Sequence, residues 1–296
     1  MRVDRPGAVA PGRARLRSRN TGAAALETLI AVPIVLFAGL LMLQFALVLN
    51  ARQAVMHAAV EGARTGAVAH ADPRAIERGL ARGITPWLIG SRGALDHERA
   101  VWRALAHLQE GLIGGWVRWR QLSPRQASFQ DWGVPVLDEA GRPVPGTREI
   151  PNDHLDARRW LAGGGAEAGL LPGDGPVGPA SGQTLSDANL LKLEFTYGVA
   201  LVVPLVGRLA AWTMARVEAC PSGGRWSGAG GHAGPAGPTR LGAVVLGSPP
   251  PMVAPWATHC AFYTAVDADG QPRPRWPVRV SAVMRMQQPA RHAGPD

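Results

Sequence analysis

The sequence lacks the short motifs that mark common catalytic and cofactor-binding sites. It contains no phosphate-binding glycine loop, no Gly-x-Ser-x-Gly elbow and no zinc ligand set. Its eight histidines are scattered, and no two share a metal-ligand spacing with cysteines or carboxylates. We therefore expect a protein that is not an enzyme and that binds no metal, cofactor or small-molecule substrate.

Lysine and cysteine are scarce. Lys192 is the only lysine, and the net charge of +9 comes from arginines that are dispersed apart from one N-terminal cluster. A nucleic-acid-binding protein concentrates Lys and Arg in a patch, so we expect no nucleic-acid partner. The two cysteines are Cys220 and Cys260. In an exported domain such a pair suggests one disulfide, and two buried free thiols are the alternative.

What the chain does have is one long apolar run behind a basic leader. Residues 1–22 hold six arginines against a single acid, and residues 23–49 carry Glu27 as their only charge. The part from Leu29 to Leu49, in which Gln44 is the only strongly polar residue, would be a helix of about 31 Å, enough for a hydrocarbon core of roughly 30 Å. We therefore predict a transmembrane helix over residues 23–49.

Charge asymmetry predicts the orientation of this helix. The twenty residues after Asn50 contain only Arg52 and Arg64, against the six arginines of the leader. The positive-inside rule then places the leader in the cytoplasm and the rest of a single-pass inner-membrane protein in the periplasm. An ordinary cleaved secretory signal fits poorly, because its apolar region usually spans about 7–15 residues.

The start of the run carries a more specific pattern. In "RNTGAAALETLI", Gly22 separates the basic leader from the apolar helix, and Glu27 is the fifth residue after it. This order resembles the class III signal of type IV pilins and pseudopilins, which a prepilin peptidase cuts on the cytoplasmic side after the glycine. The resemblance implies a processing site between Gly22 and Ala23. It also implies that Glu27 pairs with the free α-amine of a neighbouring subunit and sets the axial register of a helical assembly.

A longer stretch narrows the resemblance. Residues 19–64, including "ARQAVMHAAVEGAR" from Ala51 to Arg64, are similar to TadE-like pseudopilins of the tight-adherence (Flp) pilus system. Thr28 departs from the family pattern, which usually has an aromatic residue there, and the chain is longer than most members. The resemblance implies a structural component of a pilus assembly or secretion system. Its implied partners are other pilins or pseudopilins, the prepilin peptidase and the inner-membrane pilus platform.

Residues 50–71 continue the helix as a stem. Small or slim side chains recur along one side of it: Ala51, Val55, Ala58, Gly62 and Gly66. Such a stripe lets another helix approach closely. A partner helix and packing on the chain's own domain are both consistent with it. His57 and His70 are expected at the solvated surface.

Residues 72–296 are predicted to form an α+β domain with helices, a small antiparallel sheet and Gly/Pro-rich loops. Asp72 is the expected N-cap of a first helix. A second helix is expected over residues 91–124, either continuous or broken at Gly114-Gly115. Loops are expected at 162–182 and 223–255, where Gly and Pro are too frequent for a regular element. The tryptophans of the second helix are expected in the core: Trp102, Trp116 and Trp119.

Two stretches predict the strands of the sheet. Residues 191–196 alternate apolar and polar side chains and lead into a helix that should bury Leu209 and Trp212. Residues 258–287 should form two strands. Pairing the last strand with residues 191–196 gives a small antiparallel sheet against the stem helix.

These features leave two hypotheses. In the first, the chain is a TadE-like pseudopilin that loses its leader. In the second, it is a signal-anchored periplasmic domain, a binding module or an enzyme of unrelated function, that keeps its leader. The N-terminus of the mature protein distinguishes the two.

Overall fold

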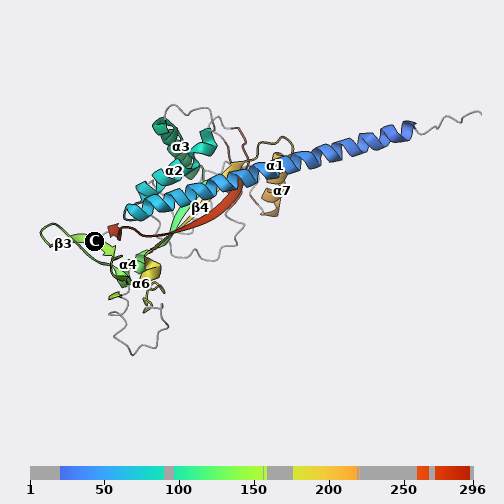
Figure 1. Cartoon of the computed structure of the whole chain (residues 1–296). Helices are drawn as coiled ribbons and strands as arrows, with labels where there is room; N and C mark the ends of the chain where they lie inside the picture. Colours follow the sequence, from blue (N-terminus) through green and yellow to red (C-terminus); the bar gives the residue numbers. More distant parts are fainter. Residues whose placement is uncertain are drawn as a thin grey trace, which may run out of the picture. The chain divides into compact units, whose positions relative to one another are not determined.

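The computed structural model describes residues 21–89, 97–155, 157–158, 176–218, 220, 259–266 and 271–293. The chain divides into two units, residues 1–42 and residues 43–296, with the boundary inside helix α1 (Thr21–Val68). The first unit contributes the N-terminal part of that helix. The second holds the rest of α1 together with further helices and two antiparallel sheets (Figure 1). The predicted α+β class is therefore confirmed.

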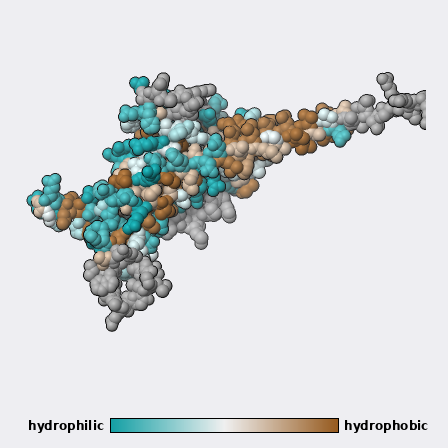
Figure 2. Space-filling view, in the orientation of Figure 1, coloured by the Kyte–Doolittle hydropathy of each residue, from teal (hydrophilic) through white to brown (hydrophobic). Residues whose placement is uncertain are grey.

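Helix α1 has 48 residues and continues through Pro33. Among the described residues it is the one helix long and apolar enough to cross a membrane. Most side chains between Ala25 and Met42 are exposed, and Figure 2 shows hydrophobic residues covering this part of the helix. A helix that is apolar on all sides needs an apolar environment around it, so this segment is suited to lipid or to other helices.

Helix α2 (Pro73–Ile89) begins at the N-cap expected from the sequence. The Asp72 carboxylate accepts a hydrogen bond from the Ala75 N–H at 3.0 Å. The apolar residues of α2 recur every four positions and are all buried: Ile76, Leu80 and Ile84. Helix α3 (His97–Ile113) packs on α2.

The first sheet has the strand order β1-β4-β5, all antiparallel, from β1 (Val117–Ser123), β4 (Leu190–Ala200) and β5 (Arg275–Arg285). Leu193 is paired with Ala282 and Phe195 with Val280, so apolar residues of both strands share one face. The predicted pairing of these two strands is confirmed. The sheet contacts the stem through Leu191 of β4, whose Cδ2 would lie 2.8 Å from a Cβ on Gly66. Just after β5, the Gln287 N–H donates to the Ala67 carbonyl oxygen at 2.9 Å.

The second sheet has the order β2-β3-β6, from β2 (Val134–Leu137), β3 (Pro143–Ile150) and β6 (Ala290–Ala293). The turn between β2 and β3 is closed by Asp138, whose carboxylate accepts hydrogen bonds from the N–H groups of Ala140 and Arg142. The short helix α4 packs on β3, and α6 packs on α4 and β4. Helix α7 packs on α8, which in turn packs on β5. The bounds of these four helices, in chain order, are Gln126–Trp132, Leu185–Ala188, Val206–Val217 and Cys260–Tyr263.

Three expectations for residues 91–124 and 258–287 were wrong in whole or in part. The second helix ends at Ile113, at the break considered for Gly114-Gly115, where Gly115 adopts a φ of 74°. Beyond that break the helical prediction was wrong, because residues 117–123 form a strand. Trp102 is 66% exposed, since α3 turns its alanines and Leu108 inward, whereas Trp116 is buried. The first of the two closing strands is the helix α8.

The two predicted loops lie largely outside the described residues. Residues 162–175 and 223–255 are not among them. The described end of the first loop is held by the Asp131 carboxylate, which accepts hydrogen bonds from the N–H groups of Ala180 and Ser181 at 3.1 and 2.7 Å.

Candidate functional site

The predicted processing and register residues lie in the first turns of α1. Gly22 and Ala23 have a helical backbone, and Glu27 is exposed. Ala23 and Glu27 are four residues apart, so they share one side of the helix and are about 6 Å apart along its axis. A second helix displaced by one turn would therefore bring its residue 23 level with this carboxylate.

The polar residue of the apolar run, Gln44, has a defined partner. Its Oε1 accepts a hydrogen bond from the Val203 N–H at 3.0 Å, and the Gln44 side chain is only 5% exposed. The sequence marked Gln44 as exceptional but gave no sign of its partner, which is 159 residues away. The contact satisfies a backbone donor that is itself buried, where water would not reach it.

The small-residue stripe of the stem faces the chain's own domain. All five of its residues are buried: Ala51, Val55, Ala58, Gly62 and Gly66. A Cβ on Gly66 would lie 2.6 Å from Cγ1 of Ile76 and 2.8 Å from Cδ2 of Leu191. The stripe thus brings α2 and β4 close to the stem, which is the second of the two alternatives the sequence left open.

Residues 22–64 match the family model described as TadE-like protein. The match begins at the predicted processing glycine and covers the apolar run and most of the stem. This TadE-like segment associates the chain with Tad pilus systems and with a membrane-anchoring helix. Residues 65–296 lie outside the match. No curated protein and no solved structure matches the chain.

Histidines tie the TadE-like segment and its continuation to the domain. His57 Nδ1 is 3.0 Å from the Gly83 carbonyl oxygen, and His70 Nδ1 is 2.8 Å from that of Pro289. His57 is exposed, as the sequence predicted, whereas His70 is half-buried, so the prediction was wrong for His70 only. His57 therefore links the stem to α2, and His70 links the end of the stem to the residues just before β6.

Cys220 and Cys260 form a disulfide that links the end of α7 to the start of α8. Beside it lies the Glu218 carboxylate, 4% exposed, which accepts a hydrogen bond from the Tyr263 hydroxyl at 3.0 Å and is 3.5 Å from His259 Nδ1. Burial and the Glu218 charge raise the pKa of Tyr263, and burial lowers the pKa of His259. The two cysteines and Glu218 are close enough to hold a metal ion, but the bonded sulfurs offer no thiolate.

A buried polar network lies between α3 and the first sheet. His107 Nε2 is 2.8 Å from the Tyr197 hydroxyl, and the Arg275 guanidinium lies 3.6 Å from the centre of the Trp116 ring. Burial raises the pKa of Tyr197 to about 12 and lowers the pKa of His107. The phenol therefore stays protonated and donates to a neutral imidazole. This arrangement stabilises the domain beyond the TadE-like segment and needs no substrate to explain it.

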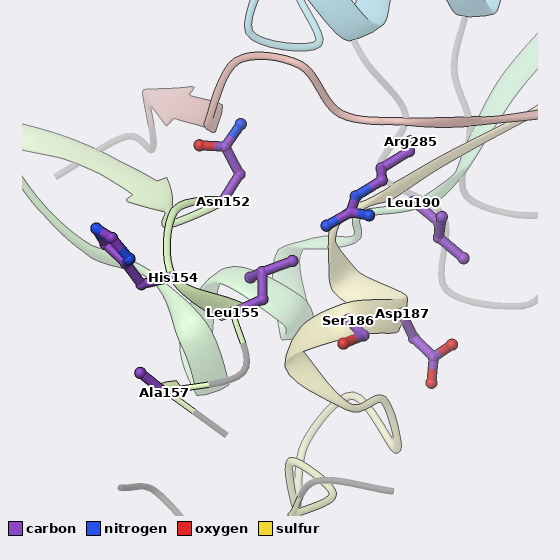
Figure 3. Close-up of a pocket in the computed structure, with 8 residues that line it drawn as sticks. All are labelled: Asn152, His154, Leu155, Ala157, Ser186, Asp187, Leu190 and Arg285. Atoms are coloured by element: carbon purple, nitrogen blue, oxygen red, sulfur yellow. The ribbon is translucent and has the colours of Figure 1, made fainter. Parts of the chain in front are cut away.

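A hollow of about 660 Å³ opens where the residues after β3 approach α6 (Figure 3). Its lining is Asn152, His154, Leu155, Ala157, Ser186, Asp187, Leu190 and Arg285. The Asp187 carboxylate points away from Arg285 and is part of the capping box of α6, in which it accepts hydrogen bonds from the N–H and the hydroxyl of the N-cap residue Thr184 at 3.4 and 2.9 Å. Among these described residues no nucleophile is hydrogen-bonded to a base, so the hollow shows no catalytic arrangement.

Proposed function

We propose that this chain is a pseudopilin or minor-pilin-like structural component of a Tad (Flp-type) pilus assembly or secretion system. In this proposal a prepilin peptidase cuts between Gly22 and Ala23. The observation that carries it is the start of the TadE-like segment at Gly22, at the head of a helix whose apolar residues up to Met42 are exposed. A helix of that kind can exchange lipid for other apolar helices without rearranging the domain.

The proposed location is the bacterial inner membrane, with the N-terminus in the cytoplasm and residues 72–296 in the periplasm. The arginine-rich leader supports this orientation. The Cys220–Cys260 disulfide supports it too, because structural disulfides persist in exported domains and are rare in the cytosol.

Assembly in this proposal uses the first turns of the helix. Cleavage leaves an α-ammonium on Ala23, and a neighbouring subunit displaced by one turn brings that group to the exposed Glu27 carboxylate. Pairing the two lowers the free-energy cost of holding both charges among apolar helices. The partners are other pilins, the peptidase and the inner-membrane platform, and the protein has no enzymatic role of its own.

The test is the mass of the intact protein isolated from its native host, with the peptidase active. We expect a chain that begins at Ala23. Gly22→Leu should abolish the cut, because a bulky side chain replaces the small residue before the scissile bond. Gly39→Leu makes the same substitution at a position where a Cβ meets nothing within 4 Å, so it should be cut normally.

A wild-type chain that keeps residues 1–22 in such cells would contradict the proposal. The second hypothesis, a signal-anchored periplasmic domain of unrelated function, would then stand in its place.

A further inference from the structure

Helix α7 turns its apolar residues away from the domain. Its buried side carries Val206, Gly207 and Ala211. The opposite side carries large side chains that are between 48% and 71% exposed: Leu205, Leu209 and Trp212. They are spaced four and three residues apart, so they form one stripe. The sequence-based expectation that Leu209 and Trp212 are buried was therefore wrong, and their exposure requires a physical reason.

The exposed side of α7 also carries positive charge beside this apolar stripe. Arg208 and Arg216 are both exposed, and the Arg216 guanidinium lies 5.4 Å from the centre of the Trp212 ring. No acidic residue occurs between Val206 and Val217. A helix face that combines Trp, Leu and Arg is typical of helices that lie in the headgroup layer of a membrane, with the aromatic ring at the interface and the cations on anionic phosphates.

The depth of this surface follows from the Gln44 contact. Gln44 lies five residues before Leu49, the end of the apolar run, which is about 7.5 Å along a helix. The Val203 N–H binds Gln44 directly, so the turn that leads into α7 reaches that level. Interfacial helices lie about 5–10 Å into the boundary between headgroups and acyl chains. The depth of about 7.5 Å for the turn before α7 falls within this range of about 5–10 Å.

The backbone of the turn supports the same conclusion. Leu205 has a φ of 64° and a ψ of −56°, and the Val206 N–H donates to the Pro204 carbonyl oxygen at 2.7 Å. This is a strained γ-turn for a residue with a bulky side chain. It projects Leu205, 71% exposed, away from the domain, and exposed Val202 lies in the same turn. Exposing these apolar side chains to water costs free energy, whereas contact with lipid removes them from water.

We propose that residues 202–216 form a second membrane contact, an interfacial surface that lies on the bilayer beside the point where α1 leaves it. Val202, Leu205, Leu209 and Trp212 enter the acyl boundary, and Arg208 and Arg216 bind phospholipid phosphates. Lipid is the occupant because any bilayer that surrounds Leu43–Leu49 also adjoins the turn bound to Gln44. The inference depends on α1 spanning the membrane, and it does not depend on cleavage at Gly22 or on pilus assembly.

The test uses the full-length chain in vesicles of phosphatidylethanolamine and phosphatidylglycerol, with bromine on the acyl chains near the headgroups as a quencher of tryptophan emission. We expect Trp212→Phe to remove much of the quenchable emission. Trp102→Phe is the matched control, because Trp102 is 66% exposed and lies on α3. It should leave the quenchable emission unchanged. Equal quenching in wild type and Trp212→Phe would overturn the proposal.

A second measurement identifies the occupant. A photo-reactive amino acid at position 209 should form adducts with phospholipid in the same vesicles, and the same amino acid at position 102 should not. Adducts of position 209 with a second copy of the chain, in place of lipid, would overturn the proposal. Both measurements are repeated with Gly22→Leu, which keeps the leader. Lipid contact without cleavage would separate this inference from the proposed function.

Discussion

At the scale of single residues, buried polar groups have partners that are remote in the sequence. Gln44 binds the Val203 amide, His107 binds Tyr197, and Arg275 donates to the Gly198 carbonyl oxygen at 3.2 Å. Each contact satisfies a group that would otherwise be buried without a hydrogen bond. These residues therefore fix how the domain packs, although none belongs to a recognisable motif.

His107 makes the stability of the domain depend on pH. Burial, with a smaller contribution from Arg275, lowers its pKa in the folded state, whereas an unfolded imidazole titrates near about 6.5. As the pH falls below that value, the unfolded chain binds a proton that the folded chain resists, and the free energy of unfolding decreases. We expect the melting temperature to fall between pH 7 and pH 5, and His107→Gln to reduce that fall.

Thermal unfolding followed by circular dichroism in detergent measures this effect. His97→Gln, at the exposed start of α3, is the control and should keep the pH dependence of the wild type. His259 and His292, whose pKa values burial also lowers, should account for the dependence that remains in His107→Gln. An unchanged pH dependence in His107→Gln would remove His107 from this account.

At the residue scale, contacts between neighbours in the sequence could be predicted, and contacts between distant residues could not. Asp72 caps α2 because its carboxylate reaches an amide three residues away. The partner of Gln44 depends on the path of the whole chain. The predicted burial of Trp102 was wrong because α3 lies close to α2. Close packing of two helices favours small side chains at the contact, so α3 buries Ala100 and Ala104 instead.

At the scale of elements, glycines decide how closely α1 and α2 approach. A Cβ on Gly83 would lie 2.6 Å from Cα of Ala58, and one on Gly79 would lie 2.8 Å from Cα of Gly62. The neighbouring atoms are backbone, so they cannot turn aside as a flexible side chain would. The stem stripe and the glycines of α2 thus form one helix–helix interface.

Gly83→Ala should destabilise the domain. Forcing a methyl group against the α1 backbone costs about 1–3 kcal/mol, which the better helix propensity of alanine offsets by up to about 1 kcal/mol. We expect a lower melting temperature and faster digestion by protease. Gly39→Ala gives the same gain in propensity without a clash, because a Cβ there meets nothing within 4 Å, and it should not destabilise the protein. Equal behaviour of the two variants would exclude close packing as the reason for Gly83.

Strand pairing could be predicted where the pattern was strong. The alternation in β4 and β5 predicted their apolar faces and their pairing, and the structure adds the register, with Leu193 opposite Ala282. The stretch that became β1 was predicted as helix because its strand state depends on pairing with β4, a contact between segments far apart in the chain. For α7 the sequence predicted a helix, but an apolar face can pack on protein or on lipid, and the pattern is the same for both.

At the scale of the whole molecule, the match to the TadE-like family model covers the N-terminal part of the chain and leaves the domain outside it. The TadE-like segment covers residues 22–64, and the proposed processing and register residues, Gly22, Ala23 and Glu27, all lie within it. The remainder supplies a folded domain closed by a disulfide between positions 40 residues apart, which in the chain-entropy model contributes about 3–4 kcal/mol. The similarity of residues 22–64 to TadE-like proteins could be predicted from the sequence because the motif is local. Most contacts of the domain could not, because they join segments far apart in the chain, and the pairing of β4 with β5 is the exception.

Assembly is the property of the whole molecule that Glu27 should control. Glu27→Ala removes the partner of the neighbouring α-ammonium, which would then lie unpaired among apolar helices. We expect this variant to insert into the membrane and to be cut after Gly22 as the wild type is, but to yield far less assembled pilus. Glu61→Ala is the matched control. It removes the only other acid of α1, at a half-exposed position paired with Arg82 at 4.0 Å, and should assemble normally. Membrane fractionation, intact mass and the amount of sheared pilus measure the three steps separately. Normal pilus yield from Glu27→Ala would show that register is set elsewhere in the helix, even if the leader is removed as proposed.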